Sequence, residues 1–86
     1  MSYYVYMILS KINNRYISYV GYTNNLTKRI NNHNTSKGAK FTNGMLWNLI
    51  YTEKYSSKNE AMKNEFKLKK DKLKRNLIKL KYINSL

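Results

Sequence analysis

The distribution of apolar and polar positions along the chain predicts three strands and three helices. Residues 3–9 are apolar at nearly every position and include aromatic and β-branched side chains, which predicts a strand buried on both faces at the centre of its sheet. The polar stretch 11–15 contains two adjacent asparagines and predicts a hairpin turn, and residues 16–22 predict the returning strand. Residues 47–55 predict a third strand, antiparallel to the first.

The first expected helix carries two polar side chains on its apolar side. It begins after an asparagine cap, Asn24 or Asn25, and runs to about residue 34. On a helical wheel of about 100° per residue, Arg29 and His33 fall on or beside the apolar stripe. A guanidinium and an imidazole that face the protein interior need hydrogen-bonding partners there.

A carboxylate also falls on an apolar stripe in the second expected helix. Ser57 and Glu60 have the spacing of a capping box, which predicts a helix from about residue 58 to residue 70. The wheel places Glu65 inside the apolar arc of this helix, which comprises Ala61, Met62, Phe66 and Leu68. A carboxylate in such a position must be paired with a cation or bind a metal ion, because its desolvation is costly.

The last segment, residues 71–86, predicts a basic amphipathic helix. Asp71 marks the break after the second helix. The apolar stripe of the segment comprises Leu73, Leu77 and Leu80, with Ile78 alongside. No internal repeat, low-complexity tract or domain boundary is visible in the sequence, so we expect one domain over residues 1–86.

The charge balance indicates a polyanionic partner. Lysine and arginine number 17 against 4 acidic residues, for a net charge of +13. Nucleic acid is the first candidate partner and an anionic membrane surface is the second. A basic protein without such a partner is the plain alternative.

The absence of cysteine narrows the chemistry that the chain can perform. It excludes disulfides, cysteine-ligated zinc and thiol catalysis. With one histidine, the chain also lacks the ligands for a His/Cys metal cluster, so a metal ion would be held by oxygen atoms. The sequence has no apolar run of transmembrane length, and residues 1–9 lack the basic start of a secretory signal. We therefore expect no membrane partner and an intracellular, not secreted, protein, whether cytoplasmic, nuclear or viral.

Five polar side chains together indicate phosphodiester hydrolysis with one metal ion. They are Tyr6, Tyr19, Arg29, His33 and Glu65. A lone carboxylate can hold Mg²⁺, an arginine can stabilise charge on phosphoryl oxygens, and a tyrosine can accept a proton if its pKa is lowered. Each residue alone also has an ordinary interpretation, such as core packing for the tyrosines or an ion pair between Glu65 and the lysine four residues later. Only the combination favours catalysis.

A polar loop over residues 35–46 offers contacts to a phosphate backbone. It contains two glycines and two lysines, a composition that an ordinary connecting loop could equally have. The candidate nucleic-acid contacts are Lys37, Lys40 and Thr42 in this loop, and Lys28 on the first expected helix.

The ordered set of motifs resembles the GIY-YIG nuclease family over about residues 3 to 70. The first family motif corresponds to Tyr4-Val5-Tyr6, with tyrosine where glycine is usual, and the second to Tyr19-Val20-Gly21. Arg29 and His33 follow in an Arg-x-x-x-His-Asn arrangement, and the segment that ends at Glu65 resembles the helix whose last glutamate is the metal ligand. The segment from residue 38 to residue 47 resembles the loop of the structure-specific Slx-type and single-domain bacterial branches. The matching positions are Gly38, Ala39, Thr42, Gly44 and Trp47.

This resemblance implies an α/β (α+β) fold, with a three-stranded antiparallel sheet flanked by helices. It also implies a divalent-metal-dependent endonuclease that leaves 5′-phosphate and 3′-hydroxyl ends. Glu65 would hold one Mg²⁺ or Mn²⁺ ion, Arg29 would bind the scissile phosphate, and His33 would support a tyrosine or the water. Tyr6 and Tyr19 would position or deprotonate the water, and which of them is the base stays open.

Two departures from the larger family members shape the expected substrate. The Slx-type enzymes carry a cysteine-rich zinc domain, and this chain has no cysteine. Homing and restriction members carry a DNA-recognition domain, which this sequence does not show. We therefore expect cleavage of branched or flapped DNA with little sequence specificity, with a protein partner as a candidate source of targeting. The alternatives are a non-catalytic nucleic-acid-binding module of the same fold and a small basic RNA-associated protein.

Overall fold

The sheet is antiparallel, with the first strand in its middle. The structure is a computed structural model that describes residues 1–35 and 44–86. Strands β1 (Tyr3–Ile12), β2 (Arg15–Thr23) and β3 (Asn48–Tyr55) pair in the order β2-β1-β3, and both pairs are antiparallel. Residues 5–10 of β1 are buried, which confirms the expected central strand.

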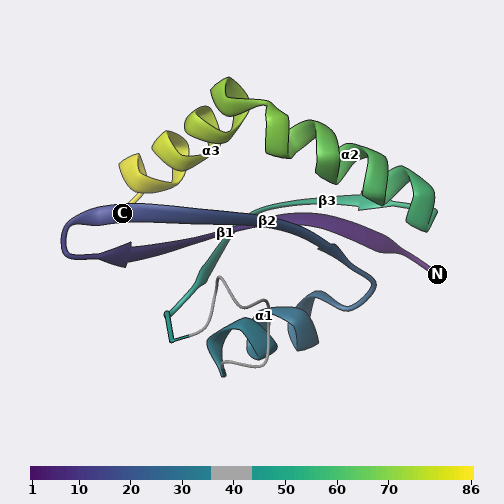
Figure 1. The fold of residues 1–86 in the computed structure, drawn as a ribbon, viewed down its shortest axis with the longest axis horizontal. Helices are drawn as coiled ribbons and strands as arrows, with labels where there is room; N and C mark the ends of the chain where they lie inside the picture. Colours follow the sequence, from purple (N-terminus) through teal and green to yellow (C-terminus); the bar gives the residue numbers. More distant parts are fainter. Residues whose placement is uncertain (36–43) are drawn as a thin grey trace.

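Helices cover both faces of this sheet. Helix α1 (Leu26–Asn34) lies on one face, and α2 (Lys58–Lys70) and α3 (Lys72–Asn84) lie over the other (Figure 1). The side chains of Val5 and Met7 belong to the core beneath α2, whereas Tyr6 and Ile8 belong to the core on the α1 side, because successive residues of a strand face opposite ways. The predicted three-stranded antiparallel sheet flanked by helices is confirmed.

Local side chains account for the turn and the helix starts. Asn13 and Asn14 adopt positive φ angles of 49° and 67°, as a two-residue hairpin turn between β1 and β2 requires. Asn25 caps α1 through a hydrogen bond from a backbone N–H to its side chain. Ser57 and Glu60 form the predicted capping box, in which the Glu60 N–H donates to Ser57 Oγ at 3.2 Å and Ser57 Oγ donates to Glu60 Oε1 at 3.1 Å.

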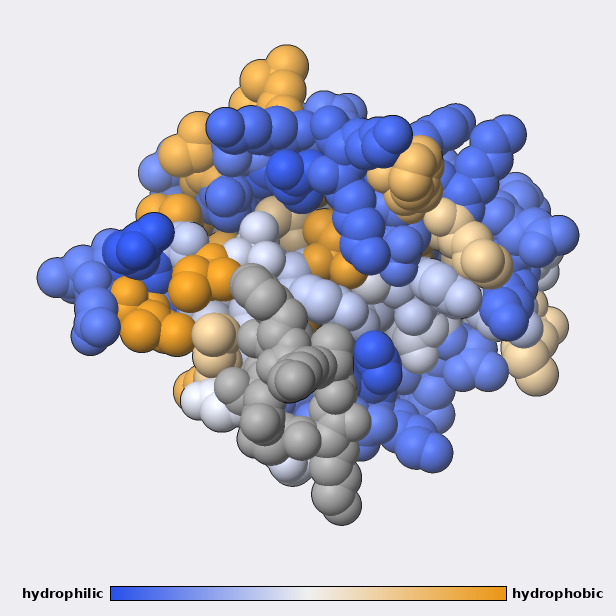
Figure 2. Space-filling model, in the orientation of Figure 1, coloured by the Kyte–Doolittle hydropathy of each residue, from blue (hydrophilic) through white to orange (hydrophobic). Residues whose placement is uncertain are grey.

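The apolar stripe of the last helix is exposed. Leu73, Leu77 and Leu80 of α3 are each more than half exposed, whereas Ile78 packs against the core. A short helix on a small sheet buries only one side, and the leucine stripe lies roughly 100° or more around the helix from Ile78. Figure 2 shows apolar side chains at the molecular surface over this helix.

The apolar arc of α2 is also narrower than the sequence pattern predicts. Ala61 and Leu68 are buried, but Met62 and Phe66 are exposed, and the Phe66 ring lies 4.4 Å from the ammonium of Lys70. The predicted apolar arc around Glu65 is therefore correct for Ala61 and Leu68 and wrong for Met62 and Phe66.

Among residues 1–35 and 44–86, no helix combines the length and the apolar character that crossing a membrane would require.

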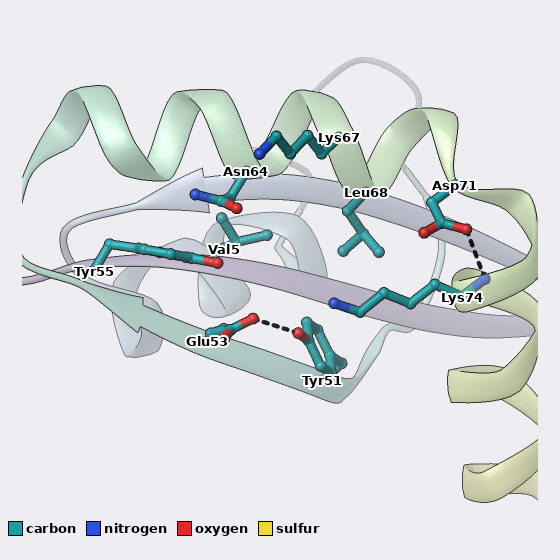
Figure 3. A pocket seen from close by; sticks show the side chains of 9 residues that line it. All are labelled: Val5, Tyr51, Glu53, Tyr55, Asn64, Lys67, Leu68, Asp71 and Lys74. Atoms are coloured by element: carbon teal, nitrogen blue, oxygen red, sulfur yellow. Dashed lines mark hydrogen bonds between the residues drawn. The ribbon is translucent and has the colours of Figure 1, made fainter.

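A polar cavity of about 170 Å³ lies between β3 and the junction of α2 and α3 (Figure 3). The Tyr51 hydroxyl donates a hydrogen bond of 2.6 Å to Glu53 Oε2, and the Lys74 ammonium lies 5.5 Å from the centre of the Tyr51 ring. Burial and the neighbouring Glu53 carboxylate raise the pKa of Tyr51 to about 12, and the same hydrogen bond lowers the pKa of Glu53. This cluster connects the start of α3 to the edge strand β3.

The raised pKa of Tyr51 predicts a loss of stability at alkaline pH. The unfolded chain loses the Tyr51 proton near pH 10 and the folded protein only at about pH 12, so this contribution to stability is complete below pH 10 and falls between these values. We expect a loss of about 1 kcal/mol, because Tyr51 is partly exposed and solvent screens the shift. Urea unfolding should show the stability advantage of the wild type over Tyr51→Phe shrinking across this range. Glu53→Gln should reduce the effect without removing it, and a constant advantage would contradict the prediction.

Candidate active site

The side chain of Tyr6 is fully buried and packs against Gly21 of the neighbouring strand. Tyr6 pairs with Gly21 in the β1–β2 ladder. A Cβ atom added to Gly21 would lie 2.4 Å from the Tyr6 hydroxyl oxygen and 2.7 Å from Cζ, distances that a real side chain does not permit. The glycine of the Tyr19-Val20-Gly21 motif therefore creates the space in which the Tyr6 ring lies.

The buried Tyr6 hydroxyl lies between two basic side chains of α1. Arg29 Nε donates to the Tyr6 oxygen at 3.2 Å, and His33 Nε2 lies 2.8 Å from the same oxygen. Since an arginine can only donate, the arrangement that satisfies all three groups has the Tyr6 hydroxyl donating its proton to an unprotonated Nε2. The expectation that Arg29 and His33 face inward and have partners there agrees with this geometry.

The electrostatics of the cluster favour a neutral histidine and a neutral tyrosine. Burial and the nearby Arg29 charge lower the pKa of His33. Burial raises the pKa of Tyr6, although the Arg29 guanidinium opposes that rise. The hydrogen bond with Tyr6, supported by Tyr19, raises the pKa of Arg29. At neutral pH the cluster therefore holds one fixed positive charge, on Arg29.

Tyr19 lies beside the same cluster but reaches the molecular surface. Its ring centre is 5.2 Å from that of His33, with the planes tilted by 60°, and the Tyr6 ring centre is 5.8 Å from His33. Tyr19 is only partly buried and lines a shallow cavity along β2, whereas Tyr6 has no exposed surface. The two tyrosines thus differ in access to solvent.

Glu65 lies on α2, on the opposite face of the sheet from α1. Its side chain is 18% exposed, and Lys69 Nζ lies 3.4 Å from its Oε1 atom. The Glu65 charge contributes to the raised pKa of Tyr6, so the carboxylate acts on the tyrosine by electrostatics. The structure therefore brings Tyr6, Tyr19, Arg29 and His33 into one cluster and leaves Glu65 outside it, on α2.

The Glu65 carboxylate is the candidate ligand for a divalent metal ion among the predicted site residues. The described residues contain no group of three or more histidine, cysteine, aspartate or glutamate side chains that could enclose a metal ion. Mg²⁺ retains several water ligands in proteins and commonly needs only one or two carboxylates together with substrate phosphate. A partly exposed carboxylate fits this coordination.

Three of the four predicted nucleic-acid contacts cannot be placed. Lys37, Lys40 and Thr42 lie outside the described residues, and Lys28 is exposed on α1.

The sequence did not predict one structural contact: the side chain of Asn34 forms hydrogen bonds with both the backbone N–H and the backbone C=O of Trp47. The distances are 2.6 Å from Trp47 N to Asn34 Oδ1 and 3.1 Å from Asn34 Nδ2 to Trp47 O. The sequence signal for this contact is the asparagine that directly follows His33.

The sequence matches a known class of catalytic domain. The model of the GIY-YIG catalytic domain matches residues 2–79. The chain belongs to the GIY-YIG family. Members of this family are generally nucleases that depend on divalent metal ions.

The chain is also similar to several small bacterial proteins. The UPF0213 protein of Staphylococcus haemolyticus is 45% identical over 67 residues, which cover 77% of this chain and 78% of that protein. That of Oceanobacillus iheyensis is 46% identical over 52 residues, covering 59% of this chain and 60% of the relative. The second alignment thus spans less than two-thirds of the relative. The solution NMR structure of a UPF0213 protein from Bacillus halodurans is 38% identical, covers 94% of this chain and 86% of its own, and has a TM-score of 0.49.

The contact between Tyr6 and Gly21 predicts a large effect of one added methyl group. We expect Gly21→Ala to destabilise the protein by about 1–3 kcal/mol, because the added Cβ would overlap the fully buried Tyr6 ring. Thermal unfolding measures the loss. Because the shortest contact is to the hydroxyl oxygen, Tyr6→Phe in the Gly21→Ala background should restore part of the stability. If Gly21→Ala unfolds like the wild type, the ring does not occupy this position.

Proposed function

We propose that the protein is a divalent-metal-dependent endonuclease that hydrolyses DNA phosphodiester bonds, with a preference for branched or flapped DNA over particular sequences. The observation that carries this proposal is the hydrogen-bonded chain from Arg29 through Tyr6 to His33, beside a surface-accessible Tyr19. A cation fixed against two tyrosines can stabilise both a scissile phosphate and an ionised phenol. The proposed products are 5′-phosphate and 3′-hydroxyl ends.

Arg29 is the proposed phosphate ligand. Its Nε–H donates to Tyr6, which fixes the guanidinium, and the side chain is only partly buried. A guanidinium held in this way can meet the charge that develops on the phosphoryl oxygens without reorganising. Arg29 would therefore contribute more to the reaction than to binding, since the rest of the chain supplies many other cations.

Tyr19 is the proposed contact to the attacking water. Tyr6 is fully buried and its hydroxyl is committed to Arg29 and His33, so it acts as a positioning group. Tyr19 lines a cavity at the surface and lies beside the same arginine. In the proposed step, Tyr19 orients a water molecule that attacks phosphorus and loses a proton to solvent, and the bond to the 3′ oxygen breaks as that oxygen takes up a proton from solvent.

The proposed metal ion binds at Glu65. One Mg²⁺ or Mn²⁺ held by this carboxylate would neutralise charge on the phosphate and on the departing oxygen. The ion pair with Lys69 is compatible with this assignment, because an exposed pair of this kind contributes little to stability and can separate. His33 keeps Tyr6 oriented and needs no ligand role.

The activity is tested with labelled branched, flapped and linear DNA in the presence of Mg²⁺ or Mn²⁺. We expect cleavage of branched or flapped DNA, slower cleavage of linear duplex, and none with a chelator. Arg29→Ala should reduce the cleavage rate by about 100-fold or more while DNA affinity changes little, and Arg29→Lys should rescue poorly. Binding without cleavage under every condition would identify a non-catalytic nucleic-acid-binding module instead.

Glu65→Gln separates the metal role from a structural role. The substitution keeps the shape of the side chain and removes the charge, so cleavage should fall to background while thermal unfolding shifts by no more than about 1 kcal/mol. Glu53→Gln is the matched control, because it also removes one carboxylate charge, at a residue of β3 that is hydrogen-bonded to Tyr51 and has no proposed metal role. A Glu65→Gln protein that is clearly destabilised and still cleaves DNA would refute the metal-ligand assignment.

A further inference from the structure

A shallow cavity of about 310 Å³ runs along the outer edge of the sheet, beside the proposed active site. It is lined by Ser18, Tyr19 and Val20 of β2, by Lys69 of α2 and by Arg75 of α3. Val20 belongs to the core beneath α2, whereas Tyr19 packs with the core on the α1 side. The cavity therefore lies at the sheet edge between the tyrosine cluster and the helix that carries Glu65.

Strand β2 is an edge strand, and this determines what the cavity offers. Within the described residues β2 pairs only with β1. Every second N–H and C=O group of an edge strand points away from the sheet and is free to bond to a ligand. The strand therefore supplies backbone donors, the hydroxyl of Ser18 and the ring of Tyr19 along one side of the cavity.

Arg75 holds the opposite side in place. Its Nη1 atom donates to the carbonyl of Leu68 at 2.9 Å and also to the carbonyl of Lys69. These carbonyls end α2 and carry the partial negative charge of a helix C-terminus. Arg75 offsets that charge and fixes the last turn of α2, from which Lys69 projects.

Of the described residues that line this cavity, Lys69 is the cation that can change partners. Its ammonium lies 3.4 Å from Glu65, but the side chain is 49% exposed, whereas that of Glu65 is 18% exposed. A lysine head on a flexible four-carbon stem can move several ångströms without any movement of the helix. The same lysine thus contacts the proposed metal ligand and lines the edge cavity.

We propose that the edge cavity binds the phosphodiester backbone of the DNA strand next to the cleavage site, and that Lys69 is its exchangeable contact. This inference rests on the proposed function. In the free protein Lys69 is paired with Glu65. When a divalent ion takes the Glu65 carboxylate, the ammonium is released to a phosphate in the cavity. Metal and DNA then bind cooperatively, because each favours the same position of Lys69.

The first test measures Mn²⁺ binding to the protein without DNA, by the fall in the resonance signal of free Mn²⁺. Removing the competing ammonium in Lys69→Gln should tighten Mn²⁺ binding about two- to fivefold, the range expected for an exposed ion pair. Lys67→Gln is the matched control, because it removes the same charge from the same helix. Lys67 lines a different cavity, together with Glu53 and Tyr51 (Figure 3). Its Mn²⁺ affinity should change by less than about twofold.

The second test measures affinity for a labelled flapped duplex in the Arg29→Ala background, which keeps the DNA intact. With Mg²⁺ present, Lys69→Gln should weaken binding about threefold more than Lys67→Gln, as expected for the loss of one phosphate contact. With chelator present, the two substitutions should have equal effects, because Lys69 is then held by Glu65. Glu65→Gln should free Lys69, and it should bind DNA equally well with and without the ion.

Equal effects of the two lysine substitutions in both tests would overturn the inference and leave Lys69 as a general surface charge. Unchanged Mn²⁺ affinity in Lys69→Gln would do the same. These outcomes are independent of cleavage. If the wild type cleaves no DNA, the proposed function fails, while the comparison of Lys69→Gln with Lys67→Gln still decides whether ion and strand bind cooperatively through this lysine.

Discussion

The buried hydroxyl of Tyr6 is the constraint on which the rest of the site depends. A phenol oxygen with no exposed surface needs partners inside the protein, and here α1 supplies them as Arg29 and His33. This requirement fixes the rotation of α1 about its own axis, since the two side chains are one turn apart and must both meet the same atom. It also fixes residue 21 as glycine, because any Cβ there would overlap the ring. One buried oxygen thus connects the central strand, the edge strand and the first helix.

The position of β2 at the edge of the sheet determines how the two halves of the site meet. The tyrosine cluster lies on the α1 face and Glu65 lies on the α2 face, so a central strand between them would separate the two. At the edge of the sheet only the backbone of β2 lies between the two faces, and the cavity along residues 18–20 runs beside that strand. A nucleic-acid strand lying along β2 would meet Tyr19 and Lys69 together. The arrangement accounts for proposed site residues that come from opposite layers of such a small domain.

The strands, the turn and the helix caps could be predicted from the sequence because each depends on neighbouring residues. Ser57 and Glu60 meet through local hydrogen bonds, and Asn13 and Asn14 form a two-residue turn. The wheel also placed Arg29 and His33 correctly on the inner side of α1. It failed for Met62, Phe66 and the leucines of α3, since periodicity identifies an apolar stripe but not whether a neighbouring element covers it. The shared bond at Tyr6 and the closure of Asn34 on Trp47 are tertiary contacts, and no local pattern encodes them.

The four acidic residues of this strongly basic chain are all engaged, and the kind of partner differs among them. Glu60 accepts hydrogen bonds from the hydroxyls of Ser56 and Ser57, Asp71 accepts one from a backbone N–H at the start of α3, and Glu53 accepts one from the hydroxyl of Tyr51. Those partners are fixed by the fold. Glu65 pairs with a lysine ammonium that is half exposed and attached through a flexible chain. In a protein of net charge +13, a carboxylate with no fixed partner attracts any cation within reach, whether a lysine or a divalent ion. The same position that makes Glu65 the least constrained acid therefore makes it the one suited to exchange partners.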